Sequence, residues 1–354
     1  MDALNRVVVF QTAFTGDVIL TLPMIQRLKR HIPHSAIDLV ATPSGAAVAA
    51  HHPALRRTLV YDKKGADRGL APAFRLAQHL RKEAYDAAII PHRSIRSAAI
   101  CYGAGIPRRI GFSTSSGRFL MSDVVRYDAA RHEILRNLAL LAPLGAPTHP
   151  LELPSLYPSP ADMEAVNSLL EHEHPRSGLP LVALAPGSVW ATKRWLPERY
   201  RELAQRLTSE GFRVVMIGGH DDLMLGNAIT AGLEPGTFIN AMGKLTVLQA
   251  AELIRRCTLA VTNDSSPMHL ATAMRTPVIA IFGATVPALG FAPVGKFDRV
   301  VETNGLRCRP CAIHGGNRCP IGSFDCMKNI TVTHVLDTVH DVLSSLRTQV
   351  GSSS

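Results

Sequence analysis

The sequence contains few aromatic residues and no long hydrophobic run. Aromatic side chains make up 5% of the 354 residues, and there are two tryptophans. No apolar stretch reaches the roughly 18–20 residues that a helix needs to cross a bilayer. The opening MDALNRVVVF lacks the basic, apolar and small-residue order of a secretory signal. We therefore expect a cytoplasmic protein, and the scarcity of aromatic residues argues against a nucleic-acid-binding surface.

Two familiar nucleotide-binding fingerprints are also missing. No Gly-x-Gly-x-x-Gly follows a predicted strand, which removes the main support for an NAD-linked oxidoreductase. The segment GAGIPRR, residues 103–109, begins like that fingerprint but has a proline where the helix would open. The Walker sequence Gly-x4-Gly-Lys-Ser/Thr is absent as well. Any phosphate site in this chain must therefore be built from other loops.

The composition is that of a globular protein with more than one domain. Hydrophobic residues make up 46% and charged residues 19% of the chain, which is ordinary for a folded protein. A single core rarely keeps growing to 354 residues, so two domains are expected.

The formal net charge of +10 lies entirely in the first half of the chain. Residues 1–150 hold 20 Lys and Arg against 10 Asp and Glu, whereas residues 151–354 hold 18 of each kind. A one-sided basic field attracts anionic partners such as a phosphorylated substrate or an anionic membrane face. The alternative is a solvated basic surface with no partner.

Apolar runs and amphipathic segments alternate along the chain in two blocks. RVVVFQ (6–11) predicts a buried strand, and residues 16–32 predict an amphipathic helix. Residues 142–160 hold six prolines, which exclude a regular helix or central strand and indicate a linker. The alternation restarts near residue 179. This pattern predicts an α/β fold with parallel sheets covered on both faces and ligands at the carboxyl ends of the strands.

Three segments share one pattern, in which an apolar strand is followed by small residues and then by a polar residue at a helix start. In the first, VVVFQTAFTGDVIL, Gly16 frees the turn and Asp17 falls at the helix N-terminus. Aspartate at this place commonly caps the helix. The alternative is a carboxylate that acts as a general base.

The second segment, APGSVWATKRWLP, contains both tryptophans. Gly187 allows a sharp turn, Ser188 and Thr192 offer hydroxyl groups, and Lys193 offers a point charge suited to a phosphate oxygen. Trp195 stands beside a helix start, so we expect it to pack into the domain. The loop as a whole is typical of one that surrounds a diphosphate.

The third segment is LAVTNDSSPMHLATAM. Asp264, Ser265 and Ser266 are helix-capping residues at the end of a predicted strand, and free N–H groups at a helix start form an anion site. His269 falls one turn into the helix. The alternative interpretation is a well-capped helix with a packed histidine.

Together these segments resemble the ADP-heptose:lipopolysaccharide heptosyltransferases, glycosyltransferase family 9, and in particular the heptosyltransferase II type. The resemblance spans residues 6–345 and rests on TGDVILTLPMIQRLK, PGSVWATKRWL and TNDSSPMHLATAMRTPVIAIFG. It implies a GT-B fold, in which two doubly wound, Rossmann-like parallel-sheet domains face each other across a cleft. The implied parts are an acceptor-binding domain with the catalytic base (1–155), an ADP-sugar-binding domain (156–331) and a C-terminal helix that crosses back (332–350).

The resemblance also implies roles for single residues. It makes Asp17 the catalytic base and Lys193 the phosphate-contacting lysine. The implied ADP-sugar contacts are Gly187, Ser188, Thr192, Lys193, Leu245, Asp264, Ser265, Ser266 and His269. The acceptor contacts predicted are Gly16, Arg93, Arg96 and Arg108. Adenine is expected near residues 242–245. The contact to ribose or heptose is expected from His220, Asp221 or Asp222, and the choice among these three stays open.

The implied reaction is direct displacement at the anomeric carbon of ADP-L-glycero-β-D-manno-heptose, with inversion. The implied partners are ADP-heptose and the acceptor heptose-Kdo2-lipid A at the cytoplasmic face of the inner membrane, where the chain would be peripheral. No nucleic acid partner, no required cofactor and a monomer are expected. The alternatives are Kdo as acceptor (heptosyltransferase I type), a protein acceptor, an NAD-linked oxidoreductase, and a non-catalytic nucleotide-sensing protein.

Four of the six cysteines cluster late in the chain, at Cys308, Cys311, Cys319 and Cys326. The CxxC half is typical of metal sites, and disulfides are not expected in a cytoplasmic chain. In the family that the chain resembles, related cysteines are dispensable in some enzymes and hold a structural iron in some protein-directed ones. Two interpretations stay open, namely a structural zinc or iron site and a reduced, packed loop.

Overall fold

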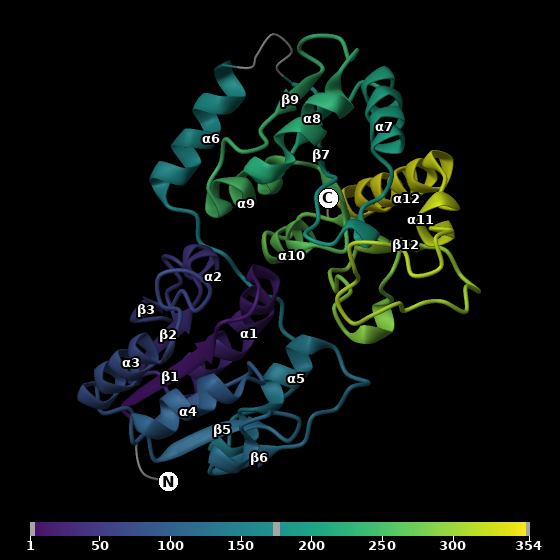
Figure 1. Ribbon diagram of the computed structural model, residues 1–354. Coiled ribbons are helices and arrows are strands. Elements are labelled where there is room, and N and C mark those ends of the chain that lie inside the picture. Colours follow the sequence, from purple (N-terminus) through teal and green to yellow (C-terminus); the bar gives the residue numbers. More distant parts are fainter. Residues whose placement is uncertain (1–3, 173–177, 352–354) are drawn as a thin grey trace. The chain divides into compact units, whose positions relative to one another are not determined.

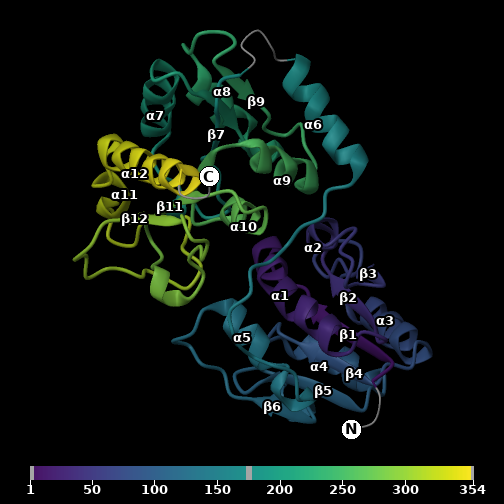
Figure 2. The ribbon, with the colours of Figure 1, turned by 180° about the vertical axis from the view of Figure 1, so that it is seen from behind.

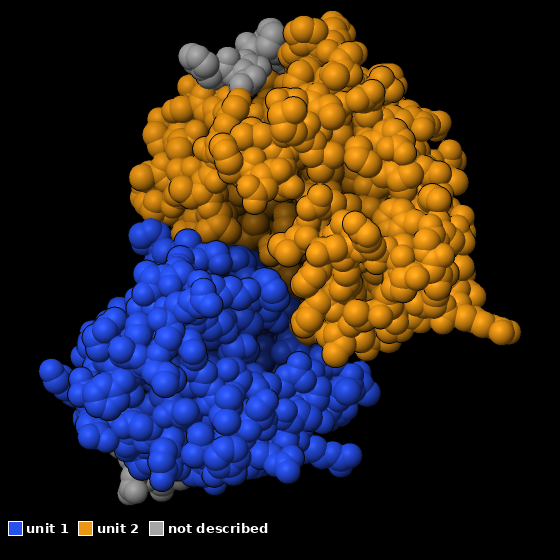
Figure 3. All heavy atoms as spheres, viewed as in Figure 1, with its two compact units in different colours: residues 1–157 blue, residues 158–354 orange. Residues whose placement is uncertain are grey.

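The computed structural model describes residues 4–172 and 178–351, which divide into two compact units. Unit 1 comprises residues 1–157 and unit 2 residues 158–354 (Figure 3). The division falls within the proline-rich stretch that the sequence indicates as a linker, close to the expected boundary after residue 155.

Unit 1 is a six-stranded parallel sheet with flanking helices (Figure 1). Its elements are β1 (Arg6–Gln11), α1 (Thr15–His31), β2 (Ala36–Ala41), α2 (Pro43–Val48), β3 (Arg57–Val60), α3 (Leu70–Lys82), β4 (Ala87–Ile90), α4 (Ile95–Gly103), β5 (Arg108–Phe112), β6 (Asp123–Val125) and α5 (Glu133–Ala139). The strand order is β3-β2-β1-β4-β5-β6. The chain therefore reverses its direction of growth between β1 and β4, and loops that follow such strands form the usual ligand site.

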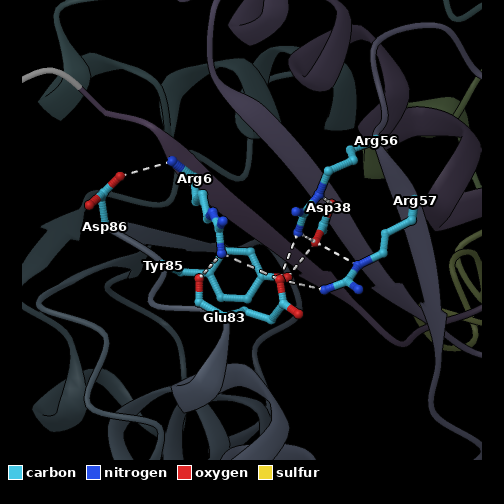
Figure 4. A network of polar contacts seen from close by, with 7 residues as sticks. All are labelled: Arg6, Asp38, Arg56, Arg57, Glu83, Tyr85 and Asp86. Carbon is cyan, nitrogen blue, oxygen red and sulfur yellow. Dashed lines mark hydrogen bonds and ion pairs between the residues drawn. The ribbon is translucent and has the colours of Figure 1, made fainter.

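A polar network closes the amino edge of this sheet (Figure 4). The buried carboxylate of Asp38 accepts hydrogen bonds from Arg56, Arg57 and Tyr85. Glu83 Oε2 pairs with the two arginines at 3.0 and 2.8 Å. Burial alone would raise the pKa of Asp38, but these hydrogen bonds outweigh it and lower the pKa. The network fixes the amino ends of the strands, away from the edge at which ligands are expected.

Unit 2 repeats the same architecture. Its elements are α6 (Pro160–His172), β7 (Leu181–Ala185), α7 (Pro197–Ser209), β8 (Arg213–Met216), α8 (Leu223–Thr230), β9 (Phe238–Asn240), α9 (Val247–Arg256), β10 (Leu259–Asn263), α10 (Ser266–Ala273), β11 (Val278–Phe282), β12 (Arg299–Glu302), α11 (Asp325–Lys328) and α12 (Val332–Gly351). The order β12-β11-β10-β7-β8-β9 places the reversal between β7 and β10. Both units confirm the predicted doubly wound, parallel-sheet class.

The C-terminal helix packs within unit 2. Helix α12 contacts α7, β11 and β12 (Figures 1 and 2), and Val335, Val339 and Val342 belong to the apolar core of the unit. These contacts explain why the helix is amphipathic. Its predicted crossing to the first domain stays a prediction. Within the described part of the chain, no helix is long and apolar enough to span a membrane.

Trp195 confirms the expectation that it packs into the domain. Its side chain is 1% exposed, and its Nε1 donates to the carbonyl of Ile330 at 3.0 Å. The ring meets Tyr200 edge-on at a centroid distance of 5.1 Å, a favoured arrangement of two aromatic rings. The indole therefore anchors the start of α7 beside the loop that carries Lys193.

Candidate active site

Asp17 lies in the first turn of α1, directly after β1 and therefore beside the point where the sheet of unit 1 reverses. Its Oδ2 accepts a hydrogen bond from the N–H of Phe14 at 3.1 Å. The carboxylate thus caps its own helix, as the simpler interpretation predicts. A carboxylate has about four acceptor positions, so bonds to backbone N–H groups at the helix start do not prevent a second role.

The pKa of Asp17 is raised to about 6. Burial is the main cause, and the charge of Glu133 adds to it, whereas the Phe14 N–H and the charge of Arg93 act in the opposite direction. Glu133 is the first residue of α5, which packs against α1. At neutral pH the group is ionised, yet it is about a hundredfold more basic than an exposed aspartate. These are the properties of a general base matched to its working pH.

Cationic side chains follow the neighbouring strands at the same edge. Arg93 follows β4, and its guanidinium lies 4.7 Å from the centre of the Tyr127 ring. Lys63 follows β3 and donates to Thr12 Oγ1 at 3.3 Å. Burial, and then the charges of nearby Lys64 and Arg96, lower the pKa of Lys63. The structure therefore brings two of the predicted acceptor arginines to the carboxyl edge and adds a lysine that the sequence analysis missed.

The remaining predicted acceptor residues have different positions. Gly16 is buried in the first turn of α1, next to Asp17. Arg108 is the first residue of β5 and therefore lies at the amino edge of the sheet, opposite Asp17. Its guanidinium donates to the carbonyl of Pro143 at 2.7 Å and to Asp123 at 3.4 Å. Arg108 does not join the other predicted residues, because a strand puts its first and last residues at opposite edges.

In unit 2 the predicted residues centre on an ion pair. Lys193 Nζ lies 2.6 Å from Asp264 Oδ2, and both side chains are largely buried. Lys193 is on the loop after β7 and Asp264 follows β10, so the pair spans the reversal point of the second sheet. Thr285, after β11, donates to the same oxygen of Asp264 at 2.6 Å. A lysine held in this way is a fixed positive charge at the edge where α/β sheets bind phosphates.

Asn263, a helix-capping candidate in the sequence, instead links the two loops, a role that the sequence did not predict. Its Nδ2 donates to the carbonyl of Pro186 at 2.7 Å. Its Oδ1 accepts from the backbone N–H of Trp195 at 3.0 Å and from the Tyr200 hydroxyl at 3.2 Å. Because Asn263 is buried, these bonds fix the loop of Lys193 to the end of β10.

The start of α10 adjoins this pair. Ser265 is the N-cap residue, and its side chain makes no capping hydrogen bond. Its Oγ lies 3.4 Å from Thr262 Oγ1, and the helix begins at Ser266. His269 is buried in the same helix. N–H groups at an N-terminus whose cap side chain leaves them open suit an anionic ligand.

Loops after β7, β8 and β9 meet beside the ion pair. A Cβ on Gly187 would lie 2.5 Å from Asp222 Oδ2, so only glycine allows this approach. The same oxygen accepts from the N–H of Gly219 at 3.0 Å. Of the three open candidates, Asp222 is shown to lie against Gly187. Gly243 N–H donates to Gly218 O at 3.0 Å, which brings the segment of Leu245 to the same edge.

Comparisons with known proteins show to which family the chain belongs. A family model described as glycosyltransferase family 9 (heptosyltransferase) matches residues 73–316. The chain belongs to this family. It is 30% identical over 293 residues to lipooligosaccharide heptosyltransferase 2 of Haemophilus influenzae, covering 80% of this chain and 84% of the relative. It is 28% identical to lipopolysaccharide heptosyltransferase 2 of Salmonella typhimurium, covering 96% and 99% of the two chains.

A solved structure extends the comparison to the whole fold. The structure of E. coli ADP-heptose lps heptosyltransferase II superposes with a TM-score of 0.80 at 26% identity, covering 97% of this chain and 99% of that one. This family 9 glycosyltransferase therefore has the GT-B architecture of two Rossmann-like domains, as the resemblance implies.

The four late cysteines of this glycosyltransferase are free thiols, of which Cys326 is buried. Burial, followed by the neighbouring Cys308 and Cys319, raises the pKa of Cys311, so the side chains lie near one another. Among the residues that the structure describes, however, no three His, Cys, Asp or Glu side chains are arranged to hold a metal ion. A structural zinc or iron site at these cysteines and a reduced, packed loop both stay predictions.

Proposed function

We propose that this glycosyltransferase moves L-glycero-D-manno-heptose from ADP-heptose to the inner core of lipopolysaccharide, as a heptosyltransferase II. The names of its relatives, which include lipopolysaccharide and ADP-heptose, support this choice of acceptor and donor. The observation that carries the proposal is the pair of groups at the two reversal points, a basic carboxylate on unit 1 and a fixed lysine on unit 2. An inverting sugar transfer needs these two groups.

Unit 2 binds the donor in this proposal. The diphosphate contacts Lys193 and the N–H groups at the start of α10, where Ser265 and Ser266 lie. Asp264 and Asp222 are then beside the sugar and ribose hydroxyls, and the segment 242–245 contacts adenine. An arriving phosphate shares Lys193 with Asp264, so the lysine is already oriented before the ligand binds.

The chemistry follows from where charge develops. Asp17 takes the proton of the acceptor hydroxyl as its oxygen forms a bond to the anomeric carbon of heptose. The bond from that carbon to the phosphate oxygen breaks on the opposite side, and ADP leaves with the electron pair. A positioned base contributes typically about 10²–10⁴-fold. Lys193 and the α10 N–H groups stabilise the charge that grows on the departing diphosphate.

Unit 1 binds the acceptor. Heptose-Kdo2-lipid A carries phosphates and carboxylates, and Arg93, Arg96 and Lys63 place positive charge at the edge where Asp17 lies. These three cations are part of the positive charge that is concentrated in the first half of the chain.

Helix α3 fits a peripheral association with the anionic inner membrane. Leu70 and Phe74, one helical turn apart, are 83% and 65% exposed. Arg75, Arg81 and Lys82 are exposed on the same helix. Exposed apolar residues beside basic ones suit the surface of a membrane rich in anionic lipid.

The acceptor distinguishes this proposal from its nearest alternatives. Purified enzyme is incubated with ADP-heptose and with acceptors that end either in Kdo or in one heptose, and the products are weighed by mass spectrometry. We expect one added heptose on the heptose-terminated acceptor. Addition to the Kdo-terminated acceptor alone would make the enzyme a heptosyltransferase I, and addition to neither would point to a protein acceptor or refute the transfer.

A further inference from the structure

The loop that carries the cysteines reaches the loop that carries Lys193. The N–H of Thr192 donates to the carbonyl of Gly316 at 3.0 Å. In return, the N–H of Gly316 donates to Thr192 Oγ1 at 2.8 Å. Thr192 is buried, so this reciprocal pair joins two segments more than a hundred residues apart in the chain through a desolvated contact. When one partner of a buried hydrogen bond is removed, the other stays desolvated and unpaired, which is unfavourable.

Gly315 brings the same loop against the stem of the lysine. Its φ is +83°, and a Cβ at this position would lie 3.1 Å from Lys193 Cγ and 3.1 Å from Thr192 Oγ1. The left-handed backbone favours glycine, and a Cβ this close would push the neighbouring side-chain atoms away by a few tenths of an ångström. The loop therefore packs directly against the Lys193 side chain.

The other end of the cysteine loop holds the carboxylate partner. Arg309, with a side chain 5% exposed, pairs with Glu302 at 2.7 Å and donates to the carbonyls of Gly283 and Thr285 at 2.5 and 2.7 Å. The N–H of Cys311 donates to the carbonyl of Ala284 at 2.9 Å. These bonds fix the backbone of Thr285, whose hydroxyl donates to Asp264.

We propose that residues 309–316 are a positioning element for the Lys193–Asp264 pair, and that Thr192 serves the site through Gly316 rather than by touching the ligand. The segment holds Lys193 from one side and Asp264, through Thr285, from the other. This inference rests on the proposed donor site in unit 2. It gives Thr192 a role different from the direct ligand contact that the family resemblance implies.

The first test changes the hydroxyl of Thr192. Thr192→Val keeps the shape of the side chain but removes the acceptor for the Gly316 N–H, whereas Thr192→Ser retains it. We expect Thr192→Val to weaken ADP binding by about tenfold or more and adenosine binding by less than about twofold, measured by titration calorimetry. Thr192→Ser restores ADP affinity. Thr208→Val on α7, whose hydroxyl donates to Gln205 within its own helix, is the matched control.

The second test separates contact from backbone strain. Gly315→Ala and Gly305→Ala both put a Cβ on a residue with positive φ, but the Cβ at Gly305 meets nothing within 4 Å. We expect Gly315→Ala alone to weaken ADP relative to adenosine and to raise the KM for ADP-heptose. The two variants should lower the thermal midpoint to a similar extent.

The outcomes keep this inference apart from the proposed function. If the unmodified enzyme binds ADP no better than adenosine, the diphosphate site itself is refuted. If it prefers ADP and Thr192→Val keeps that preference, the positioning role is refuted. Equal loss of ADP and adenosine affinity in Thr192→Val or in Gly315→Ala would show a general structural role and would also overturn the inference.

Discussion

At the residue scale, Asp17, the proposed base, caps its own helix and lowers the stability of the folded state. Its pKa in the folded protein, about 6, lies above the ordinary 3.8. The folded state therefore disfavours the ionised carboxylate. The resulting loss of folding stability is fully present above pH 6 and disappears as the pH falls toward 4. Each pKa unit corresponds to about 1.4 kcal/mol, so the cost at neutral pH is on the order of 3 kcal/mol before solvent screening.

Asp17→Asn is accordingly expected to stabilise unit 1. The amide oxygen can still accept the Phe14 N–H, while the buried charge is gone. We expect the thermal midpoint at pH 8 to rise by a few degrees and the difference from the unmodified enzyme to shrink as the pH falls below 6. A lower midpoint at pH 8 would indicate that the carboxylate stabilises the fold.

Glu133 offers a way to adjust the base without touching it. Because its charge raises the pKa of Asp17, Glu133→Gln should lower that pKa. We expect the acidic limb of the kcat/KM profile, measured from about pH 5 to pH 8, to lie near pH 6 in the unmodified enzyme and at lower pH in the variant. Glu202→Gln, on the exposed face of α7, should leave the limb in place. If the acidic limb of Glu133→Gln stayed at the same pH, the group that titrates in the profile would not be Asp17.

Lys193→Ala tests the diphosphate contact. Hydrogen bonds to charged groups contribute roughly 1.5–3 kcal/mol, so ADP-heptose and ADP should bind at least about tenfold more weakly. Adenosine lacks the phosphates and should be affected much less. Calorimetric titration of the three ligands compares them directly, and an equal loss for all would exclude a phosphate role.

At the element scale, the local pattern of the sequence predicted most helices and strands. The strand predicted over residues 6–11 is β1, Arg6–Gln11, and the helix predicted over residues 16–32 is α1, Thr15–His31. Caps, turns and apolar periodicity depend on residues that are close together in the chain, so they can be recognised in the sequence.

Contacts between distant segments were the part that the sequence could not supply. The links of Asn263 to Pro186 and of Thr192 to Gly316 depend on which loops the strand order brings together. Glu133 reaches Asp17 only because α5 packs on α1. The place of Arg108 at the amino edge of the sheet likewise depends on where β5 begins.

Helix α3 carries a prediction of its own. The double variant Leu70→Ser with Phe74→Ser removes exposed apolar surface and leaves the basic residues in place. We expect it to bind vesicles with anionic lipid several-fold more weakly in a sedimentation assay, with unchanged turnover on a short, lipid-free acceptor. Unchanged vesicle binding would show that helix α3 does not make the membrane contact.

At the scale of the whole molecule, the two units have the same sheet architecture and different proposed roles. Each unit presents its functional residues where its own sheet reverses, Asp17 after β1 and the Lys193–Asp264 pair after β7 and β10. In the proposed function, the basic half carries the base and the neutral half carries the donor site. This division fits an acceptor rich in negative charge and a donor whose two phosphates need only one lysine and a helix start.

The most direct test of the account is turnover of Asp17→Asn, with its affinity for ADP-heptose measured on the same preparation. The account predicts that affinity stays within a few fold of the unmodified enzyme while heptose transfer falls by at least about a hundredfold. Near-normal transfer with intact donor binding would contradict it, because another group would then have to take the proton from the acceptor.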